Sequence, residues 1–430
     1  MQLMASRRAF LALPFSAAAL RGAPRTAEIQ KMIDAAAAHG GGTVVIPPGR
    51  HVTGTLELRS RVRLLLEPGA VLEASRDLAD FRILPGPVRG YTDNYTDKSL
   101  IHAEDAEDVS IEGRGVIDGQ GAAFKGPYKV RPYLIRMIRC RNVAVSGVTL
   151  KDSPMWVQHY LGCDGVAIHG ITVQSRVNQN NDGIDIDSSR RVRISDCSIS
   201  SGDDAIVLKS TTLEPCRGVA IANCTLSSAC NAFKLGTESN GGFLDVTLSN
   251  CTIDETRLAG IALEIVDGGE MNGVTISNVT MRGVGAPVFV RLGNRARPSV
   301  PDGPRQPVGR LRNVSISGVL ARGGGPVGCA IAGLPGHPAE NLSLTGLRLE
   351  FAGGGTAEQA RREIPELPDA YPEFQMFGPL PAYGLYCRHV KGLRLRDIEL
   401  ETEKPDLRPP LVCSDVEELR TDNTPRVTQA

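Results

Sequence analysis

Residues 142–150 read NVAVSGVTL, in which apolar and polar residues alternate on both sides of a Ser-Gly turn. The pattern returns along the chain, and the first apolar residue of successive copies from Val143 to Val274 recurs every 23 to 28 residues. This period is typical of a solenoid, whose coils must stack because one coil cannot bury its inward apolar row alone. The other copies are DVSI at 108–111, GVAIHGITV at 165–173, RVRISDCSI at 191–199, GVAIANCTL at 218–226, DVTLSNCTI at 245–253, GVTISNVTM at 273–281, NVSISGVLA at 313–321, NLSLTGLRL at 341–349 and GLRLRDIEL at 392–400.

The composition of each copy separates this solenoid from other repeat architectures. A leucine-rich repeat would need a fixed asparagine and a helical return, and a propeller blade needs about 40 residues. We therefore predict an all-β fold, a single-stranded parallel β-helix. Two longer steps in the repeat correspond to insertions at 293–310 and 364–381, which we expect to line a binding face.

The N-terminal part of the repeat region differs from the rest. Residues 26–39 carry apolar residues at helical spacing, Thr26 can serve as the N-cap, and the glycines at 40–42 end the pattern. We predict a helix that covers the open end of the solenoid, because terminal repeats need a cap.

The extreme N-terminus has the features of an export signal. Arg7 and Arg8 precede an apolar stretch at 9–20 that is too short to span a membrane comfortably. We predict a twin-arginine-type signal peptide over 1–22, followed by a β-helical catalytic domain over 23–430, with export to the periplasm or medium. The chain has 48 basic and 48 acidic residues, so we expect no nucleic-acid partner. No later segment is suited to cross a membrane, so we expect no membrane span. We also expect a monomer.

The ten cysteines follow the repeat. Cys197, Cys224 and Cys251 are 27 residues apart in the same local context, which predicts free thiols stacked in the core like small apolar residues. No Cys-x-x-Cys or Cys/His spacing indicates zinc, and we expect no metal or cofactor.

Three aspartates indicate the type of reaction that the protein catalyses. Asp182 lies in NNDGIDIDS, and Asp203 and Asp204 lie in SGDDAIVLKS, about one coil further on. Stacked coils would bring these carboxyls together, and crowding raises the pKa of at least one of them. A protonated carboxyl beside an ionised one is what hydrolysis of a glycosidic bond requires, so the three are our candidate catalytic residues.

Aligning four coils without gaps assigns the neighbouring side chains to rows. Asp182, Asp204 and Asn231 fall at the strand entry, and two outward rows follow from alternation. The first row holds Asp185, Val207, Lys234 and Ala262; the second holds Asp187, Lys209, Gly236 and Glu264. The simplest interpretation of Asp185, Asp187 and Lys209 is a solvated surface with local ion pairs.

Several motifs together resemble glycoside hydrolase family 28, the polygalacturonase-like enzymes. They are AAAAHGGGTVVIPPG at 35–49, GVIDGQG at 115–121, NVAVSGVTLKDSPMWVQ at 142–158, Asn-x-Asp at 180–182 and Gly-Asp-Asp at 202–204. The resemblance implies a right-handed parallel β-helix and an inverting hydrolase. It also implies that Asp203 is the general acid and that Asp182 and Asp204 activate water.

Two motifs of this family are altered here. The family's Gly-His-Gly falls on Cys230-Asn231-Ala232, and its Arg-Ile-Lys, whose cations hold the galacturonate carboxylate, falls on Ala262-Leu263-Glu264. We therefore expect a pectin-like polysaccharide or oligosaccharide substrate with non-standard specificity. The candidate substrate-binding residues are Asn180, Asn231, Lys234, Glu264 and Lys209, with Arg257, Arg291 and Arg295 as further cations that could contribute.

Two alternatives remain open from the sequence. A polysaccharide lyase can share this solenoid, and it would need a calcium site or a basic residue at the acidic carbon of the sugar. A carbohydrate-binding β-helix with an inactive site would be expected to have lost the acids, and all three are present.

Overall fold

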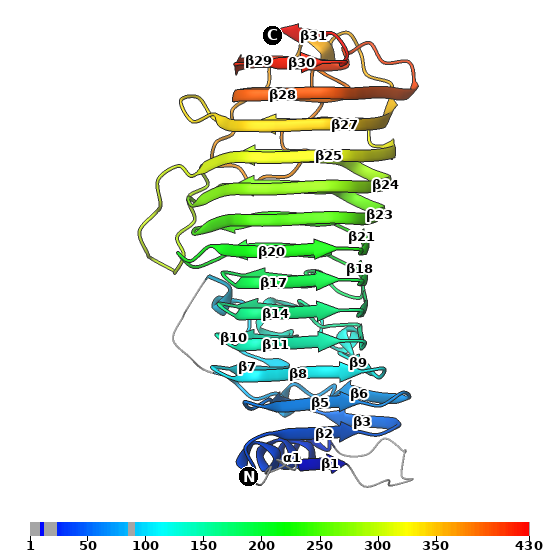
Figure 1. Ribbon diagram of the computed structural model, residues 1–430, viewed down its shortest axis with the longest axis vertical. Helices are drawn as coiled ribbons and strands as arrows, with labels where there is room; N and C mark the ends of the chain where they lie inside the picture. The colour runs from blue at the N-terminus through cyan, green and yellow to red at the C-terminus, as the bar shows by residue number, and fades with distance from the viewer. Residues whose placement is uncertain (1–8, 13–23, 85–90, 430) are drawn as a thin grey trace, which may run out of the picture.

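The computed structural model describes residues 9–12, 24–84 and 91–429. The chain forms a right-handed parallel β-helix whose coils contribute strands to three parallel sheets, and the coils stack along one axis from the N-terminus to the C-terminus (Figure 1). We call these sheets 1, 2 and 3 in the order in which the chain enters them. The predicted fold class is confirmed.

Sheet 1 carries the repeat that is visible in the sequence. Its strands are β1 (Ala9–Ala12), β2 (Gly42–Ile46), β5 (Val62–Leu66), β8 (Glu107–Gly113), β11 (Arg141–Ser146), β14 (Asp164–His169), β17 (Arg190–Ser195), β20 (Cys216–Ala222) and β30 (Arg420–Asp422). Five long strands bend through two or three of the sheets: β23 (Gly242–Ile265), β24 (Glu270–Leu292), β25 (Arg310–Gly324), β27 (Ala339–Gly353) and β28 (Leu385–Lys404).

Sheets 2 and 3 complete each coil. Sheet 2 contains β3 (Gly49–Thr53), β6 (Ala70–Ala74), β9 (Val116–Asp118), β12 (Thr149–Lys151), β15 (Thr172–Ser175), β18 (Ser198–Ser201) and β21 (Thr225–Ser228). Sheet 3 contains β4 (Leu56–Glu57), β7 (Ser99–Glu104), β10 (Tyr133–Ile138), β13 (Gln158–Leu161), β16 (Ile184–Asp187), β19 (Ile206–Ser210), β22 (Phe233–Ser239), β26 (Cys329–Ala332), β29 (Leu411–Glu417) and β31 (Val427–Gln429).

The register of sheet 1 is the register of the sequence repeat. Val143 pairs with Val109 on one side and Val166 on the other, and the same row continues through Val192 to Leu393. These side chains are buried in one continuous core. Burial of one such Val, Leu or Ile stabilises the fold by about 1.5–3 kcal/mol, so the stacked rows hold the coils together.

The cysteines form part of this core as predicted. All ten are free thiols, and nine of them are buried. The thiol of Cys224 lies between those of Cys197 and Cys251 and hydrogen-bonds with both.

Helix α1 (Thr26–Ala38) covers the N-terminal end of the solenoid, with Ile29, Ile33 and Ala36 buried against it. The prediction that Thr26 is the N-cap is wrong. Arg25 occupies the N-cap position, and its side chain makes no capping hydrogen bond. Thr26 Oγ1 accepts a hydrogen bond from Gly54 N instead, which ties the helix to the first coils. Of the predicted signal peptide, only Ala9–Ala12 is described; it forms β1 and pairs with β2.

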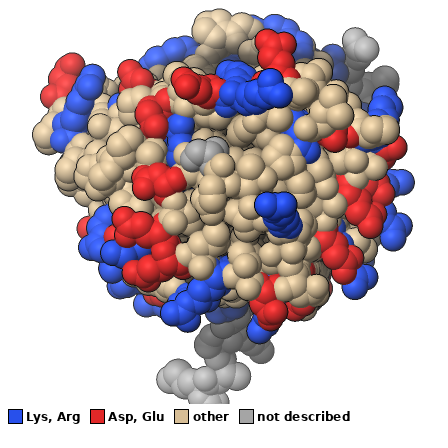
Figure 2. Space-filling model, turned by 90° about the horizontal axis from the view of Figure 1, so that it is seen from above, with Lys and Arg blue, Asp and Glu red and all other residues tan. Residues whose placement is uncertain are grey.

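Charged residues of both signs alternate around the rim of the molecule when it is viewed along the solenoid (Figure 2). Within the described part of the chain, no helix has the length and apolar character needed to cross a membrane.

Among the described residues, five short 3₁₀ helices occur in the connections: Leu78–Asp80, Tyr91–Asn94, Gly121–Ala123, Tyr128–Val130 and Gln359–Arg361. The two predicted insertions are confirmed as the long connections at 293–309, between β24 and β25, and at 354–384, between β27 and β28. Both contribute to the site described below.

Candidate active site

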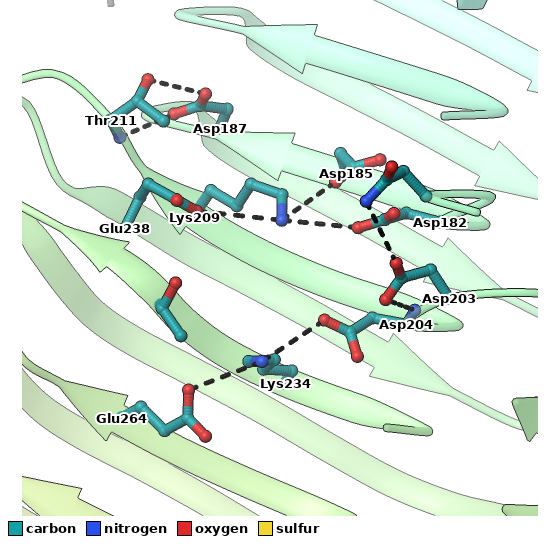
Figure 3. Close-up of polar contacts among 12 residues, drawn as sticks. Asp182, Asp185, Asp187, Asp203, Asp204, Lys209, Thr211, Lys234, Glu238 and Glu264 are labelled. Atoms are coloured by element: carbon teal, nitrogen blue, oxygen red, sulfur yellow. Dashed lines mark hydrogen bonds and ion pairs between the residues drawn. The ribbon is translucent and has the colours of Figure 1, made fainter. Parts of the chain in front are cut away.

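The three candidate aspartates converge on the outer face of sheet 3, at the entry to consecutive strands (Figure 3). Ile184 of β16 pairs with Ile206 of β19, which pairs with Phe233 of β22, so the predicted alignment of these coils is confirmed. Adjacent strands are about 4.8 Å apart. The residues just before these strands therefore lie side by side along the solenoid axis.

Asp203 and Asp204 are consecutive residues with different surroundings. Asp203 Oδ1 accepts a 3.0 Å hydrogen bond from Asp204 N, and its Oδ2 lies 3.5 Å from Asn180 Nδ2. Asp204 Oδ1 accepts hydrogen bonds from the backbone and the side-chain amide of Asn231, at 3.0 and 2.9 Å. Burial raises the pKa of Asp203, and the charge of Asp204 raises it further. Asp203 thus holds a proton more strongly than an ordinary aspartate.

Asp182 shares a buried cation with two other acids. Lys209 Nζ lies 3.4 Å from Asp182, 3.5 Å from Asp185 and 3.9 Å from Glu238. Burial raises the pKa of Asp182 well above its usual range, and the charge of Asp203 adds to the effect. Burial by itself lowers the pKa of Lys209, but Asp182 and Asp185 outweigh it and hold that pKa above its ordinary value.

The interpretation of Asp185, Asp187 and Lys209 as solvated surface is wrong. Asp185 and Asp187 are fully buried, and Lys209 is 6% exposed. Asp187 accepts hydrogen bonds from Thr211 N and Thr211 Oγ1, at 2.9 and 2.7 Å, and fixes the end of β19. Alternation correctly placed these side chains outside the core, but neighbouring side chains bury them: Asp187 lies 3.2 Å from His159 Nε2, and Lys209 Nζ lies 4.6 Å from the centre of the Trp156 ring.

The row that was expected to hold Lys209, Gly236 and Glu264 is interrupted by a bulge. Leu208 pairs with Leu235, but Ser210 pairs with Ser239, so β22 contains two extra residues after Leu235. The bulge brings Glu238 beside Lys209, where Arg297 Nη1 also donates to it at 2.7 Å. Burial raises the pKa of Glu238, but Lys209, Arg295 and Arg297 outweigh this effect and lower it.

Lys234 is a second buried cation among acids. Its Nζ lies 3.6 Å from Asp204, 3.7 Å from Glu264 and 3.1 Å from Glu373. Glu264 is fully buried, and burial raises its pKa well above the usual range. Glu373 belongs to the 354–384 connection, so this distant segment reaches the catalytic face.

A pocket of about 170 Å³ opens above these groups. Four aromatic side chains lie on its walls, although Tyr and Trp together number only nine in the whole chain. Arg297, from the 293–309 connection, lies 4.4 Å from the ring of Tyr91, so segments from coils on both sides of the site meet here. The lining consists of Tyr95, Tyr128, Trp156, Asn180, Asp182, Asp203, Asp204, Lys209, Lys234, Thr237, Glu238, Arg297 and Tyr371.

The predicted substrate-binding residues divide into two groups. Asn180, Lys209 and Lys234 line the pocket, whereas Asn231 and Glu264 are fully buried beneath it. Asn231 donates to Asp204, and Glu264 lies 3.7 Å from Lys234 Nζ, so the prediction that Glu264 binds substrate directly does not fit this arrangement.

The altered position Ala262 is also occupied by protein. It is fully buried in an apolar cluster with Phe374 and Phe377, which the 354–384 connection contributes. Of the other cations considered, Arg291 donates to the backbone of that connection, and Arg295 pairs with Asp267 beside the pocket. Arg257 is exposed and donates to Ala229 O.

Sequence reasoning missed Glu238, Arg297, Tyr371 and Glu373. The two insertions signalled where Arg297, Tyr371 and Glu373 come from, but not which of their side chains enter the pocket. Glu238 could not be found by gapless alignment, because the bulge changes its row.

Asp203, Asp204 and Cys230 are the one group of His, Cys, Asp and Glu within the described ranges that offers ligand atoms within 4.8 Å of one another. Burial and the charge of Asp203 raise the pKa of the Cys230 thiol. A thiol binds metals as its thiolate. In this structure the Cys230 thiol donates a hydrogen bond to Asp203.

The chain is similar in sequence to known polygalacturonases. A probable polygalacturonase of Vitis vinifera is 38% identical over 185 residues, which are 40% of this chain and 37% of that protein. The chain thus aligns with less than half the length of this relative. An endo-polygalacturonase of Pectobacterium carotovorum is 28% identical over 178 residues, covering 37% of this chain and 44% of that protein.

The fold is shared with a solved structure. The family 28 exopolygalacturonase of Yersinia enterocolitica superposes with a TM-score of 0.73 and 17% identity, covering 97% of this chain and 79% of that one. The model of Glycosyl hydrolases family 28 matches residues 71–362, which include Asp182, Asp203 and Asp204. With its stacked coils, its aspartates and this match over more than half of its length, the chain belongs to glycosyl hydrolases family 28.

Proposed function

We propose that the protein hydrolyses a glycosidic bond in a pectin-like polysaccharide or oligosaccharide, with inversion at the anomeric carbon. The observation that carries this proposal is the contrast between the adjacent carboxyls Asp203 and Asp204. Asp203 lines the pocket with a raised pKa, while Asp204 is held as an acceptor by Asn231 and lies beside Lys234. Such a pair combines an acid with a carboxylate, as glycoside hydrolysis requires.

In this mechanism Asp203 donates its proton to the glycosidic oxygen as the bond from that oxygen to the anomeric carbon breaks. A water molecule attacks the anomeric carbon from the opposite face, and Asp182 or Asp204 accepts its proton. The raised pKa of Asp182 makes it a stronger base than an ordinary aspartate. The products are a sugar with inverted configuration and a free hydroxyl on the leaving sugar, and one proton returns to Asp203 through solvent.

The specificity is proposed to differ from that of enzymes that bind galacturonate through an Arg-Ile-Lys motif. Each pocket cation already faces carboxylates: Lys209 faces three, Lys234 faces three, and Arg297 faces Glu238. A sugar carboxylate in the pocket would compete with these acids for the same cations. Aromatic walls and polar donors suit a sugar ring without a carboxylate.

We further propose that the protein acts as an exported monomer. The paired arginines and apolar stretch at the N-terminus support export. Helix α1 covers one end of the solenoid, which protects strand edges from pairing with a second molecule.

The proposal is tested by turnover on a panel of aryl-glycosides and pectic oligosaccharides. Proton NMR during the first turnovers is expected to show the inverted anomer. Products that absorb in the near ultraviolet would indicate a lyase instead. Absence of turnover on the whole panel, with ligand binding intact, would favour a binding-only protein.

A further inference from the structure

A second groove lies beside the catalytic pocket and differs from it in charge. It has a volume of about 540 Å³ and is lined by Lys125, Gly126, Arg131, Arg176, Val177, Asn178, Gln179 and Gly202. Three of these eight residues are cationic, and no acidic residue belongs to the lining.

Among the residues that the structure describes, the three cations donate to neutral oxygens. Lys125 Nζ donates to Val177 O at 2.6 Å and to Asn178 Oδ1. Arg176 donates to Ser200 Oγ at 2.9 Å and to Ser227 Oγ at 2.7 Å. Arg131 donates to Gln179 O at 2.5 Å and to Asn180 Oδ1 at 2.9 Å. Within the described ranges, no carboxylate forms an ion pair with any of the three, so their charge is not neutralised locally.

Arg131 has one more unused donor. It is 5% exposed, and its Nε has no hydrogen-bond partner in the described part of the protein. Guanidinium groups bind carboxylates strongly because several donors share one plane. The groove is therefore suited to an anion, in contrast to the pocket, where every cation faces acids.

The groove and the pocket share a wall. Gly202 lines the groove, and Asp203 follows it and lines the pocket. In the same way, Gln179 lines the groove, and the next residue, Asn180, lines the pocket. Arg131 donates one hydrogen bond to each of them. A ligand in the groove would thus lie next to Asp203 and its partner Asn180.

We propose that this groove binds the carboxylate of a uronic acid residue adjacent to the sugar held in the catalytic pocket. This inference rests on the proposed function, because it extends the same substrate beyond the pocket. The substrate class is then a chain in which a uronic acid in the groove neighbours a sugar without a carboxylate in the pocket. Charge recognition lies on the Arg131 side of Asp203, away from the altered positions Ala262 and Glu264.

The test measures binding rather than turnover, in the full-length Asp203→Asn variant. The probes are the two α-1,4-linked disaccharides that join one galacturonic acid to one galactose, with galactobiose as the uncharged reference. Isothermal titration calorimetry compares this background with the same background carrying Lys125→Ala and Arg176→Ala. Arg193→Ala is the matched control, because it removes an exposed cation from β17 in sheet 1.

We expect the double substitution to weaken binding of at least one uronate disaccharide about tenfold or more and to change galactobiose binding less than twofold. The uronate affinity should also fall with added salt, as expected for partly exposed charges. Equal losses for charged and uncharged probes, loss in Arg193→Ala, or failure of both uronate disaccharides to bind would overturn the proposal. Lys125→Gln with Arg176→Gln, which retains hydrogen-bond donors, repeats the measurement if the alanine variant unfolds.

The outcomes also separate this inference from the proposed function. Cation-dependent uronate binding without turnover in the wild type would retain the groove and reject the hydrolase. Turnover of neutral oligosaccharides without any uronate preference would retain the hydrolase and reject the groove.

Discussion

The backbone N–H of Asp204 donates a 3.0 Å hydrogen bond to the side-chain Oδ1 of Asp203. This contact turns the two consecutive carboxyls apart: one oxygen of Asp203 is tied to the backbone, while Asp204 faces Asn231 and Lys234. Two acids that are adjacent in the chain thereby acquire different partners, which allows one to give a proton and the other to accept one.

Asp203→Asn is expected to reduce kcat about 10²–10⁴-fold, because the amide cannot donate the proton that an acid supplies. The melting temperature should stay the same or rise, since the substitution removes repulsion with Asp204. Steady-state kinetics and thermal unfolding check both parts. Asp196→Asn, at an exposed turn, serves as control and should retain full activity.

The loss of activity at high pH should follow the pKa of Asp203. The acid form is lost as pH rises through its pKa, so the raised pKa keeps the enzyme active to higher pH than an ordinary aspartate would. A hydrogen bond from the Cys230 thiol lowers that pKa. Cys230→Ala should therefore move the alkaline limb of kcat/KM to higher pH, and Cys230→Ser, which keeps a donor, should move it less. A shift to lower pH in Cys230→Ala would contradict this role.

Lys234→Met should destabilise the fold by about 3–5 kcal/mol, because it leaves three acids without their shared cation in a buried site. Adding Glu264→Gln should recover part of the loss, since one of the unpaired carboxyls is then neutral. Urea unfolding of the two single variants and the double variant measures the coupling. Lys391→Met, at an exposed pair with Glu417, should cost less than about 1 kcal/mol. Additive effects of Lys234→Met and Glu264→Gln would refute the shared-cation interpretation.

Tyr371→Ala should raise KM about five- to tenfold with little change in kcat. The ring is 53% exposed, lies 5.5 Å from Lys234 Nζ and offers an apolar face to a bound sugar. Tyr371→Phe keeps the ring and should behave like the wild type. If KM is unchanged in Tyr371→Ala, the ring does not contact substrate.

Much of the fold followed from the sequence because the repeat is local and strict. The row from Val109 to Leu393 is both the sequence alignment and the observed register of sheet 1. A slip of one residue would turn every inward side chain outward, so one face of alternating apolar residues fixes the pairing. The position of Asp182 relative to Asp204 followed from the same rule.

The environment of the site did not follow from the sequence. Alternation places Asp185 and Lys209 outside the core, but it does not tell whether the outer face of the sheet is exposed to solvent. The connections at 293–309 and 354–384 bring Arg297 beside Glu238 and Glu373 beside Lys234, from coils that are distant in the sequence. The bulge that positions Glu238 depends on β22 pairing with a strand of different length, which a gapless alignment cannot represent.

The sequence alone thus determined the stacked coils and the three aspartates, because inward apolar rows and short-range alternation are encoded within each repeat. The tertiary structure decided which outward charges are buried, which cations are already neutralised and which, in the groove beside Asp203, are not. These properties depend on loops that pack across the coils, and packing between segments far apart in the chain leaves no periodic trace in the sequence.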